Sequence, residues 1–245
     1  MEIAERMKSY ESAYSMRTLP LIPTMVRIDG KTFHTWTKNL ETPFDKRLSN
    51  IFIETTRFLV EKTNAKLGYT QSDEITLMYY TPNTDKQIFF DRKLQKMNSV
   101  LSSMATAFFN QKVSENIPEK KDQLAFFDSR VWSVPNLEEA ANVFLWRELD
   151  AIRNSVFVVG RSYFSHKQLH GKKQGDLKKM LLDKGVDWDK DFPDYLKRGT
   201  YIARKLKEGT ELSRHVWTIL DIPFLINVSN KVDVLFENQE PILKG

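Results

Sequence analysis

The order of predicted strands and helices between residues 21 and 134 constrains the fold most strongly. An apolar, β-prone stretch at 21–28 runs into Asp29-Gly30, and helical spacing of apolar residues follows over 45–66. Strand-like segments at 75–80 and 87–90 flank a turn-rich stretch, so we expect them to pair as an antiparallel hairpin. A second long helix is predicted at 92–111 and another strand at 126–134.

This order of strand, helix, strand, strand, helix and strand predicts a ferredoxin-like α+β fold. In that βαββαβ topology two helices cover one face of an antiparallel sheet. Helices are also predicted at 2–15 and 137–160, and beyond them come short helical pieces such as 176–184 and strand-like segments at 216–224 and 231–236. We expect a catalytic domain over residues 1–160 and a smaller, basic, mainly helical extension over 161–245.

The composition indicates a folded protein and excludes several chemistries. Of the 245 residues 41% are apolar and 12% aromatic, which is enough for a hydrophobic core. The chain has no cysteine, which excludes disulfides, thiolate zinc sites and cysteine nucleophiles. The net charge of +5 is compatible with an anionic partner but does not identify one. With no apolar signal core and no long apolar run, we expect a cytoplasmic protein without a membrane partner.

Two acidic clusters adjoin predicted strands, at Asp29 and at Asp73-Glu74. In the ferredoxin-like topology the first two strands can lie close together, which would bring Asp29 near Asp73. Two carboxylates from neighbouring strands can hold a pair of magnesium ions against a triphosphate. Each cluster taken alone is more often an ordinary turn or loop, in which the carboxylate accepts hydrogen bonds from its own backbone. The two clusters together, in a topology that brings them close, make the functional interpretation as good as the structural one.

Three groups of charged residues admit both a functional and a purely structural interpretation. Cations open the second long helix, where they oppose the helix dipole, so they either bind a triphosphate or form a solvated face: Arg92, Lys93 and Lys96. Polar residues share one face of the 137–160 helix and form either a salt-bridged surface or a wall of the active site: Arg147, Asp150 and Asn154. A basic patch around Gly171 suits an RNA backbone better than zinc: His166, Lys167, His170, Lys172 and Lys173.

Five segments, in order, resemble the tRNA(His) guanylyltransferase family of 3′–5′ nucleotide-adding polymerases. They are RIDGKTFH at 27–34, QSDE at 71–74, FDRKLQKMNSVLSSMATAFF at 90–109, FDSRVW at 127–132 and FLWRELDAIRNSV at 144–156. A fainter match, FSHKQLHGK, follows at 164–172. The resemblance covers most of residues 20–175 and is specific because the five motifs occur in the right order.

The resemblance implies a palm-like catalytic domain with two Mg²⁺ ions. The ions would be held by the carboxylates of Asp29 and Asp73 and the carbonyl of Gly30, and Glu74 would be a supporting member of the catalytic motif. The nucleotide would be bound by Asp29, Gly30, Lys31, Thr32, Phe33, His34, Ser72, Asp73, Arg92, Lys93 and Lys96. As candidate contacts to RNA we take Arg147, Asp150, Arg153, Asn154, His170, Lys172 and Lys173.

The same resemblance implies the reaction and the partners. A tRNA 5′-monophosphate would be activated with ATP, and the 3′-hydroxyl of an incoming nucleotide, typically GTP, would then attack the activated end. A homotetramer is expected, since family members are commonly tetramers. Eukaryotic members carry His-Ile-Asn-Asn where this chain has Ala151-Ile152-Arg153-Asn154. This version resembles bacterial, archaeal and viral members, so template-dependent repair of tRNA 5′ ends stands beside guanylylation of tRNA(His).

Two alternatives remain open on the sequence alone. A different palm-fold enzyme, such as a nucleotidyl cyclase, would use the same metals without RNA, but would not need the basic segment at 166–173. A non-catalytic RNA-binding protein would have no use for two adjacent carboxylates, whose mutual repulsion is a cost unless a cation offsets it.

Overall fold

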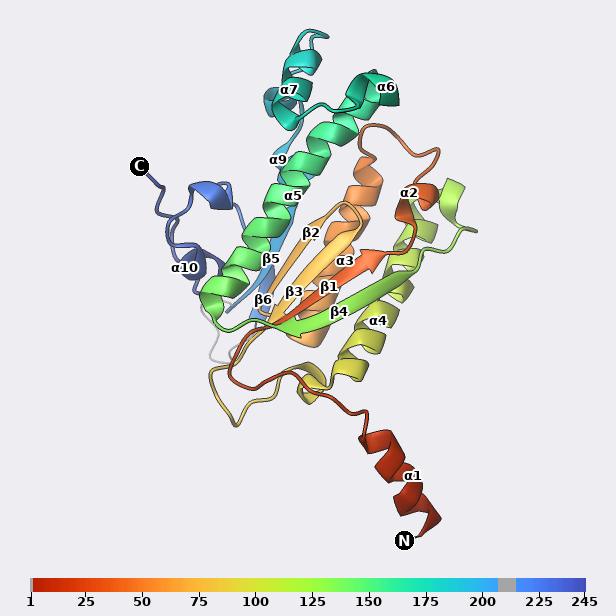
Figure 1. Cartoon of the computed structure of the whole chain (residues 1–245), viewed down its shortest axis with the longest axis vertical. Coiled ribbons are helices and arrows are strands. Elements are labelled where there is room, and N and C mark those ends of the chain that lie inside the picture. Colours follow the sequence, from red (N-terminus) through yellow and green to blue (C-terminus); the bar gives the residue numbers. More distant parts are fainter. Residues whose placement is uncertain (1, 207–214) are drawn as a thin grey trace.

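The computed structural model describes residues 2–206 and 215–245. In this part of the chain the strands form one six-stranded antiparallel sheet in the order β4-β1-β3-β2-β5-β6 (Figure 1). The strands are β1 (Thr24–Gly30), β2 (Leu67–Gln71), β3 (Glu74–Tyr79), β4 (Phe127–Ser133), β5 (Thr200–Leu206) and β6 (His215–Ile219).

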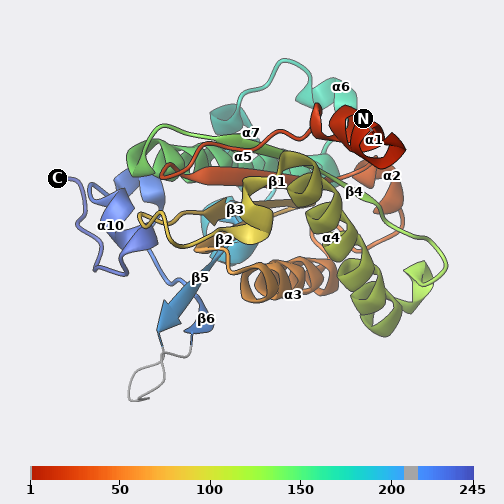
Figure 2. The same cartoon turned by 90° about the horizontal axis from the view of Figure 1, so that it is seen from below.

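The first four strands and two helices confirm the predicted ferredoxin-like α+β fold. Helices α3 (Lys46–Thr63) and α4 (Leu94–Asn116) cover one face of the sheet, and α5 (Leu137–Tyr163) lies on the other (Figure 2). Side chains alternate between the two faces of the sheet along β1. Val26 and Ile28 pack with α3 and α4 on one face, whereas Met25 packs on the other face in a second core with Phe144 of α5. Asp45 caps the N-terminus of α3, and its carboxylate accepts hydrogen bonds from the backbone N–H groups of Arg47 and Leu48.

The predicted hairpin between 75–80 and 87–90 is wrong, although the predicted element order is right. The strand that pairs with β3 is β2, joined to it by the two-residue turn Ser72-Asp73, and residues 87–90 form no strand. Gly68 concealed β2, since glycine usually interrupts strands. Here glycine is required by packing, because a Cβ atom would lie 2.6 Å from Val60 Cγ2 and 2.8 Å from Thr56 Cγ2 of α3.

The chain beyond residue 160 returns to the sheet. Strand β5 pairs with β2 and β6 with β5, so this region completes the sheet as well as adding helices. The predicted strand at 231–236 is wrong, since these residues form helix α10. The domain boundary near residue 160 stays a prediction. The helices of this region are α6 (His166–Leu169), α7 (Gln174–Leu182), α8 (Trp188–Asp191), α9 (Asp194–Arg198), the 3₁₀ turn η3 (Leu225–Asn227) and α10 (Lys231–Phe236).

The remaining short elements lie around the periphery. Helix α1 (Ile3–Ser12) projects away from the body and buries none of its side chains (Figure 1). The others are α2 (Phe33–Trp36) after β1 and the 3₁₀ turns η1 (Phe89–Arg92) and η2 (Pro118–Lys120) at the two ends of α4. No helix within the described residues is both long enough and apolar enough to cross a membrane.

We expect Gly68→Ala to destabilise the fold by roughly 1–3 kcal/mol, because the added methyl group overpacks the contact between β2 and α3. Gly175→Ala is the matched control, since Gly175 lies in helix α7 and a Cβ there meets no atom within 4 Å. Chemical denaturation of both variants measures the difference. Equal unfolding free energies would contradict the packing role of Gly68.

Candidate active site

Pairing of β1 with β3 brings the two acidic clusters together at one end of the sheet. Asp29 stands directly across from Glu74, and the Gly30 N–H donates to the Asp73 backbone oxygen at 3.1 Å. Asp73 therefore sits at the tip of the β2–β3 hairpin, beside the end of β1. Ser72 before it has φ 50°, a left-handed conformation that is uncommon for a residue with a side chain. Such local strain is often found at functional sites.

The two aspartates form a crowded, negatively charged pair. Burial raises the pKa of the Asp73 carboxyl, and the charge of Asp29 raises it further. Within the described residues, the Asp73 carboxylate accepts one hydrogen bond from another side chain, from Ser72 Oγ at 3.1 Å. In the same part of the chain the Asp29 carboxylate forms no ion pair. No three His, Cys, Asp or Glu side chains in the described ranges form a metal cluster. The pair thus provides two carboxylates whose mutual repulsion a cation would relieve.

The segment after β1 turns sharply around Gly30. A Cβ at Gly30 would lie 2.5 Å from Phe33 Cδ2, so only glycine allows the Phe33 ring to fill the core below the loop. Phe33 is buried, which leaves only its backbone for a nucleotide contact, whereas the neighbouring side chains Lys31, Thr32 and His34 are exposed. The loop therefore presents backbone amides and polar side chains beside Asp29.

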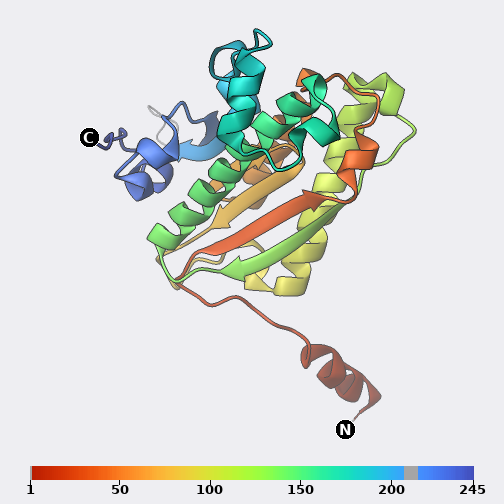
Figure 3. The same cartoon turned by 45° about the horizontal axis from the view of Figure 1, so that its top comes forward.

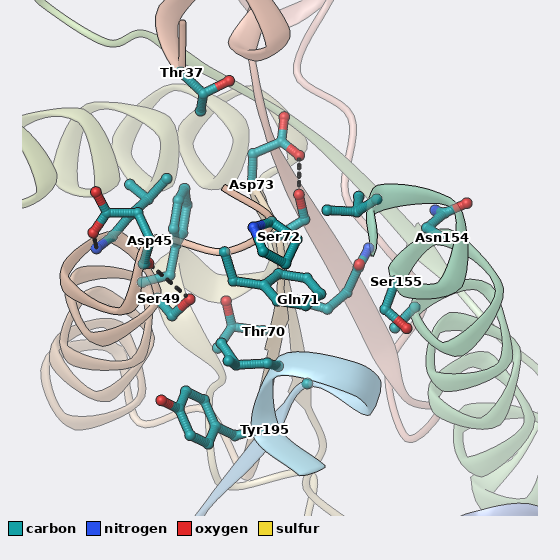
Figure 4. A pocket seen from close by; sticks show the side chains of 18 of the residues that line it. Thr37, Asp45, Ser49, Thr70, Gln71, Ser72, Asp73, Asn154, Ser155 and Tyr195 are labelled. Atoms are coloured by element: carbon teal, nitrogen blue, oxygen red, sulfur yellow. Dashed lines mark hydrogen bonds between the residues drawn. The ribbon is translucent and has the colours of Figure 1, made fainter. Parts of the chain in front are cut away.

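A cavity of about 330 Å³ opens next to Asp73 (Figure 4). Four separate parts of the chain line it: the loop before α3 with the start of α3, the β2–β3 hairpin, the middle of α5, and α9 with the start of β5. Figure 4 shows polar side chains from each part, namely Asp45 and Ser49, Thr70 to Asp73, Asn154 and Ser155, and Tyr195. The cavity combines this polar rim with apolar walls such as Leu48 and Phe52, as ligand pockets commonly do.

Glu74 connects the sheet to α5. Its carboxylate accepts two hydrogen bonds from Arg147, at 2.6 and 2.8 Å, and both side chains are buried. Arg147 also donates to Asp150 at 2.9 Å. The sequence predicts that Arg147 contacts RNA, and the structure corrects this, because its guanidinium is buried and already paired. Glu74 fits the supporting role, since it orients α5 beside Asp29.

The cations at the start of α4 do not join the aspartates. The Thr18 N–H donates to the Arg92 carbonyl and the Leu94 N–H to the Met16 carbonyl, which ties this segment to residues ahead of β1. Asp29 lies about 17 Å from Thr24 along that strand, at about 3.3 Å per residue. Helix α4 then runs along the sheet toward it, because Ser129, which stands across from Ile28, donates its Oγ hydrogen bond to the Asn98 carbonyl at 2.8 Å. Three successive residues here have φ of about 50–63°, in the left-handed region: Phe90, Asp91 and Arg92. The Nε atom of Arg92 is buried without a hydrogen bond within the described residues. Lys93 and Lys96 belong to this separate, strained basic group.

The other RNA candidates fall into two places. Asn154 borders the cavity and donates to Asp150 at 3.3 Å, and the exposed Arg153 also pairs with Asp150. The exposed residues His170, Lys172 and, next to them, Lys173 lie at the far end of α5 and the turn after α6. Because these side chains are exposed, a phosphate backbone can reach them.

Arg27, which the sequence did not single out as a site residue, lies on the same face of β1 as Asp29. Its Nε is buried without a hydrogen bond, 3.8 Å from Glu74 Oε2, and its guanidinium carbon lies 6.0 Å from the Trp146 ring. The signal was present in the sequence, because residues two apart on a strand face the same side.

Glu148 is a second residue that the sequence did not single out, and it contacts Arg198, whose neighbours Lys197 and Gly199 line the cavity. It is fully buried, lies 3.2 Å from Arg198 Nε, and accepts the Leu225 N–H at 2.7 Å. Arg198 ends α9, and its carbonyl accepts the Tyr69 hydroxyl at 2.6 Å. Burial raises the pKa of Glu148 to about 7, against the opposing effect of Arg198.

An open palm-like sheet with paired carboxylates at a strand end beside a cavity defines a nucleotidyl-transfer type of protein. The comparisons give the family. The family model described as tRNAHis guanylyltransferase (Thg1) matches residues 4–135, more than half of the chain. The chain belongs to the tRNAHis guanylyltransferase family and is a nucleotidyltransferase of that family.

Solved structures and curated relatives agree with this assignment. A structure described as a bacterial tRNA(His) guanylyltransferase (Thg1)-like protein in complex with ATP is 38% identical, covering 96% of this chain and 99% of that one, with a TM-score of 0.83. The corresponding complex with GTP is 36% identical over 91% and 94%, with a TM-score of 0.76. The tRNA(His) guanylyltransferase of Saccharomyces cerevisiae is 26% identical over 89% of this chain and 92% of that protein.

We expect Glu148→Gln to flatten the pH dependence of stability between about pH 4.5 and pH 7. In this window the folded protein keeps a proton on Glu148 that the unfolded chain releases, so the wild-type unfolding free energy falls as the pH rises. The contribution is fully present below the unfolded pKa and lost above about pH 7. Urea denaturation of both proteins at pH 5 and pH 8 measures it, and identical pH dependence would contradict the assignment.

Proposed function

We propose that the chain adds nucleotides in the 3′–5′ direction to the 5′ end of a tRNA. The observation that supports this most is the convergence of Asp29 and Asp73 beside a polar-rimmed cavity. The family supplies the reaction class, and the site supplies the two carboxylates that phosphoryl transfer to a hydroxyl requires.

Two magnesium ions fit the carboxylate pair. Burial and the charge of Asp29 disfavour the charged form of the Asp73 carboxyl. A divalent cation bound between the two carboxylates would compensate both effects. Magnesium is usually bound by one or two carboxylates together with substrate phosphates, so the absence of a third acidic ligand within the described residues is consistent. When bound, the ions supply charge neutralisation at the phosphoryl group and a lowered pKa for the attacking hydroxyl. Asp29, Asp73 and the Gly30 carbonyl would hold them.

The cavity is the proposed binding site for the nucleoside of a triphosphate. Ser72 and Asp73 line one side of it, so a triphosphate whose base lies in the cavity and whose phosphates lie on that side would place them beside the carboxylates and the loop from Gly30 to His34. The exposed side chains Lys31, Thr32 and His34 can reach those phosphates. The ATP and GTP complexes of the bacterial relatives support ATP and GTP as the nucleotides.

The strained basic group Arg92, Lys93 and Lys96 is proposed as a separate contact to polyphosphate. Helix α4 covers the face of the sheet toward which Val26 and Ile28 point, opposite to the face of Asp29, which argues against one triphosphate touching both groups. The reaction needs two phosphate-bearing substrates, an activated RNA end and an incoming nucleotide, so a second basic contact has a role. The three consecutive left-handed residues favour a functional explanation of this turn.

The RNA is proposed to be a tRNA, contacted by Arg153, Asn154, His170, Lys172 and Lys173. Within the segment at 151–154, Ala151 and Arg153 differ from the eukaryotic members, and Ala151 borders the cavity. One of the two differences therefore lies beside the proposed nucleotide site, which favours repair of truncated 5′ ends over strict use of tRNA(His). A homotetramer is proposed from the resemblance alone.

The decisive assay offers the protein a 5′-truncated tRNA, labelled GTP, ATP and magnesium. We expect label at the 5′ end, and we expect Asp29→Asn and Asp73→Asn to reduce incorporation by about 10³-fold or more while leaving the unfolding transition intact. Asp85→Asn, in the exposed turn after β3, is the control and should retain activity. No incorporation by wild type into any tRNA would overturn the proposal.

A second test addresses the cavity. Ser155 of α5 lines the cavity, so the larger side chain of Ser155→Leu should occupy space needed by the nucleoside (Figure 4). We expect KM for the nucleotide to rise about tenfold, which corresponds to about 1.4 kcal/mol, without a similar change in tRNA affinity. Ser162→Leu, on the exposed part of the same helix, is the control. Unchanged KM in both variants would place the nucleoside elsewhere.

A further inference from the structure

The edge strand β4 carries a row of side chains on the open side of the sheet. Ala125 and Phe127 are buried in the core with α4, so the residues between and beyond them face the other way: Phe126, Asp128, Arg130 and Trp132. This is the same side as Asp29 and Arg27 on β1. Figure 3 shows that α5 runs beside β1 and β4 on this side without lying over them.

Two large side chains of this row, Phe126 and Arg130, are exposed to solvent. Phe126 is 54% exposed and makes no ring contact within the described part of the chain, and the Arg130 side chain is 55% exposed. Arg130 comes no nearer to an acidic oxygen in that part than 3.8 Å from Asp128. Across β1, Trp146 of α5 is 53% exposed. An exposed aromatic side chain and an exposed cation thus share this face, with the exposed carboxylate of Asp128 between them. Aromatic rings that stack on bases, together with nearby cations, are typical of surfaces that bind nucleic-acid strands.

The row is continuous with the carboxylate site. The Phe126 carbonyl accepts the Lys31 N–H at 2.8 Å, and Asp128 stands directly across from Asp29. One step further, Arg130 stands directly across from Arg27, whose Nε has no hydrogen bond. Two like charges directly opposite on neighbouring strands are destabilising, which an anion between them would relieve.

We propose that the β4 row binds the 5′ end of the acceptor RNA. Phe126 stacks on a nucleobase next to the reacting end, and Arg130, together with Arg27, meets a backbone phosphate further along the strand. The row thereby orients the 5′ end toward Asp29 and Asp73. This inference deepens the proposed function, since it takes RNA as the acceptor, and it makes Phe126 and Arg130 positioning residues.

The test measures RNA binding apart from turnover. A 5′-truncated tRNA carrying 2-aminopurine as its first 5′ nucleotide is titrated with wild type, Phe126→Ala, Phe126→Trp and Arg130→Gln. We expect Phe126→Ala to weaken binding roughly fivefold or more and to abolish the fluorescence quenching caused by stacking, and Phe126→Trp to restore both. Arg130→Gln should weaken binding and flatten its salt dependence while quenching persists. GTP affinity should be unchanged throughout.

Leu182→Ala is the control for truncating an exposed apolar side chain, since Leu182 is 55% exposed on α7, away from the row. Wild-type affinity and quenching in Phe126→Ala would overturn the inference, even if wild type adds nucleotides. Quenching by a wild type that adds no nucleotide would support the row and overturn the function. If light scattering shows instead that Phe126→Ala or Arg130→Gln dissociates an oligomer, the face is an interface between copies and the inference is wrong.

Discussion

The antiparallel pairing of β1 with β3 is the interaction on which the site depends. Its register places Asp29 across from Glu74, and the hydrogen bond from the Gly30 N–H to the Asp73 carbonyl closes the end of the pair. A shift by one residue would turn Asp29 toward α3 and α4, because side chains alternate along a strand. The two-residue turn holds Asp73 close, so the repulsion between the carboxylates is built into the backbone.

Buried ion pairs hold the rest of the site around this register. Glu74 and Arg147 join β3 to α5, and α5 supplies Asn154 and Ser155 to the cavity. One residue along, Glu148 contacts Arg198, which holds α9 against β2 through the Tyr69 hydroxyl. Buried ion pairs are weak sources of net stability, although breaking one is costly. Their evident effect here is geometric, because they orient the two elements that wall the cavity.

Local patterns were sufficient to predict the topology and the acidic pair. The apolar run into Asp29-Gly30 and the helical spacing of α3, α4 and α5 follow from the sequence with nearly the observed bounds. The hairpin was assigned to the wrong segments because Thr81 to Asp85 has stronger turn chemistry than Ser72-Asp73. Gly68 is required by contact with α3, which no local pattern reveals. Likewise, the burial of Arg147 and the cavity depend on residues far apart in sequence.

The central claim is that Asp29 and Asp73 jointly hold divalent cations, and binding of Mn²⁺ in the presence of ATP tests it most directly. Electron paramagnetic resonance counts the free ion during titration of wild type, Asp29→Asn and Asp73→Asn, each checked for an intact unfolding transition. We expect saturable binding to wild type and at least a tenfold loss of affinity in either variant, since each removes one of two carboxylate ligands. Wild-type affinity in both variants would contradict it.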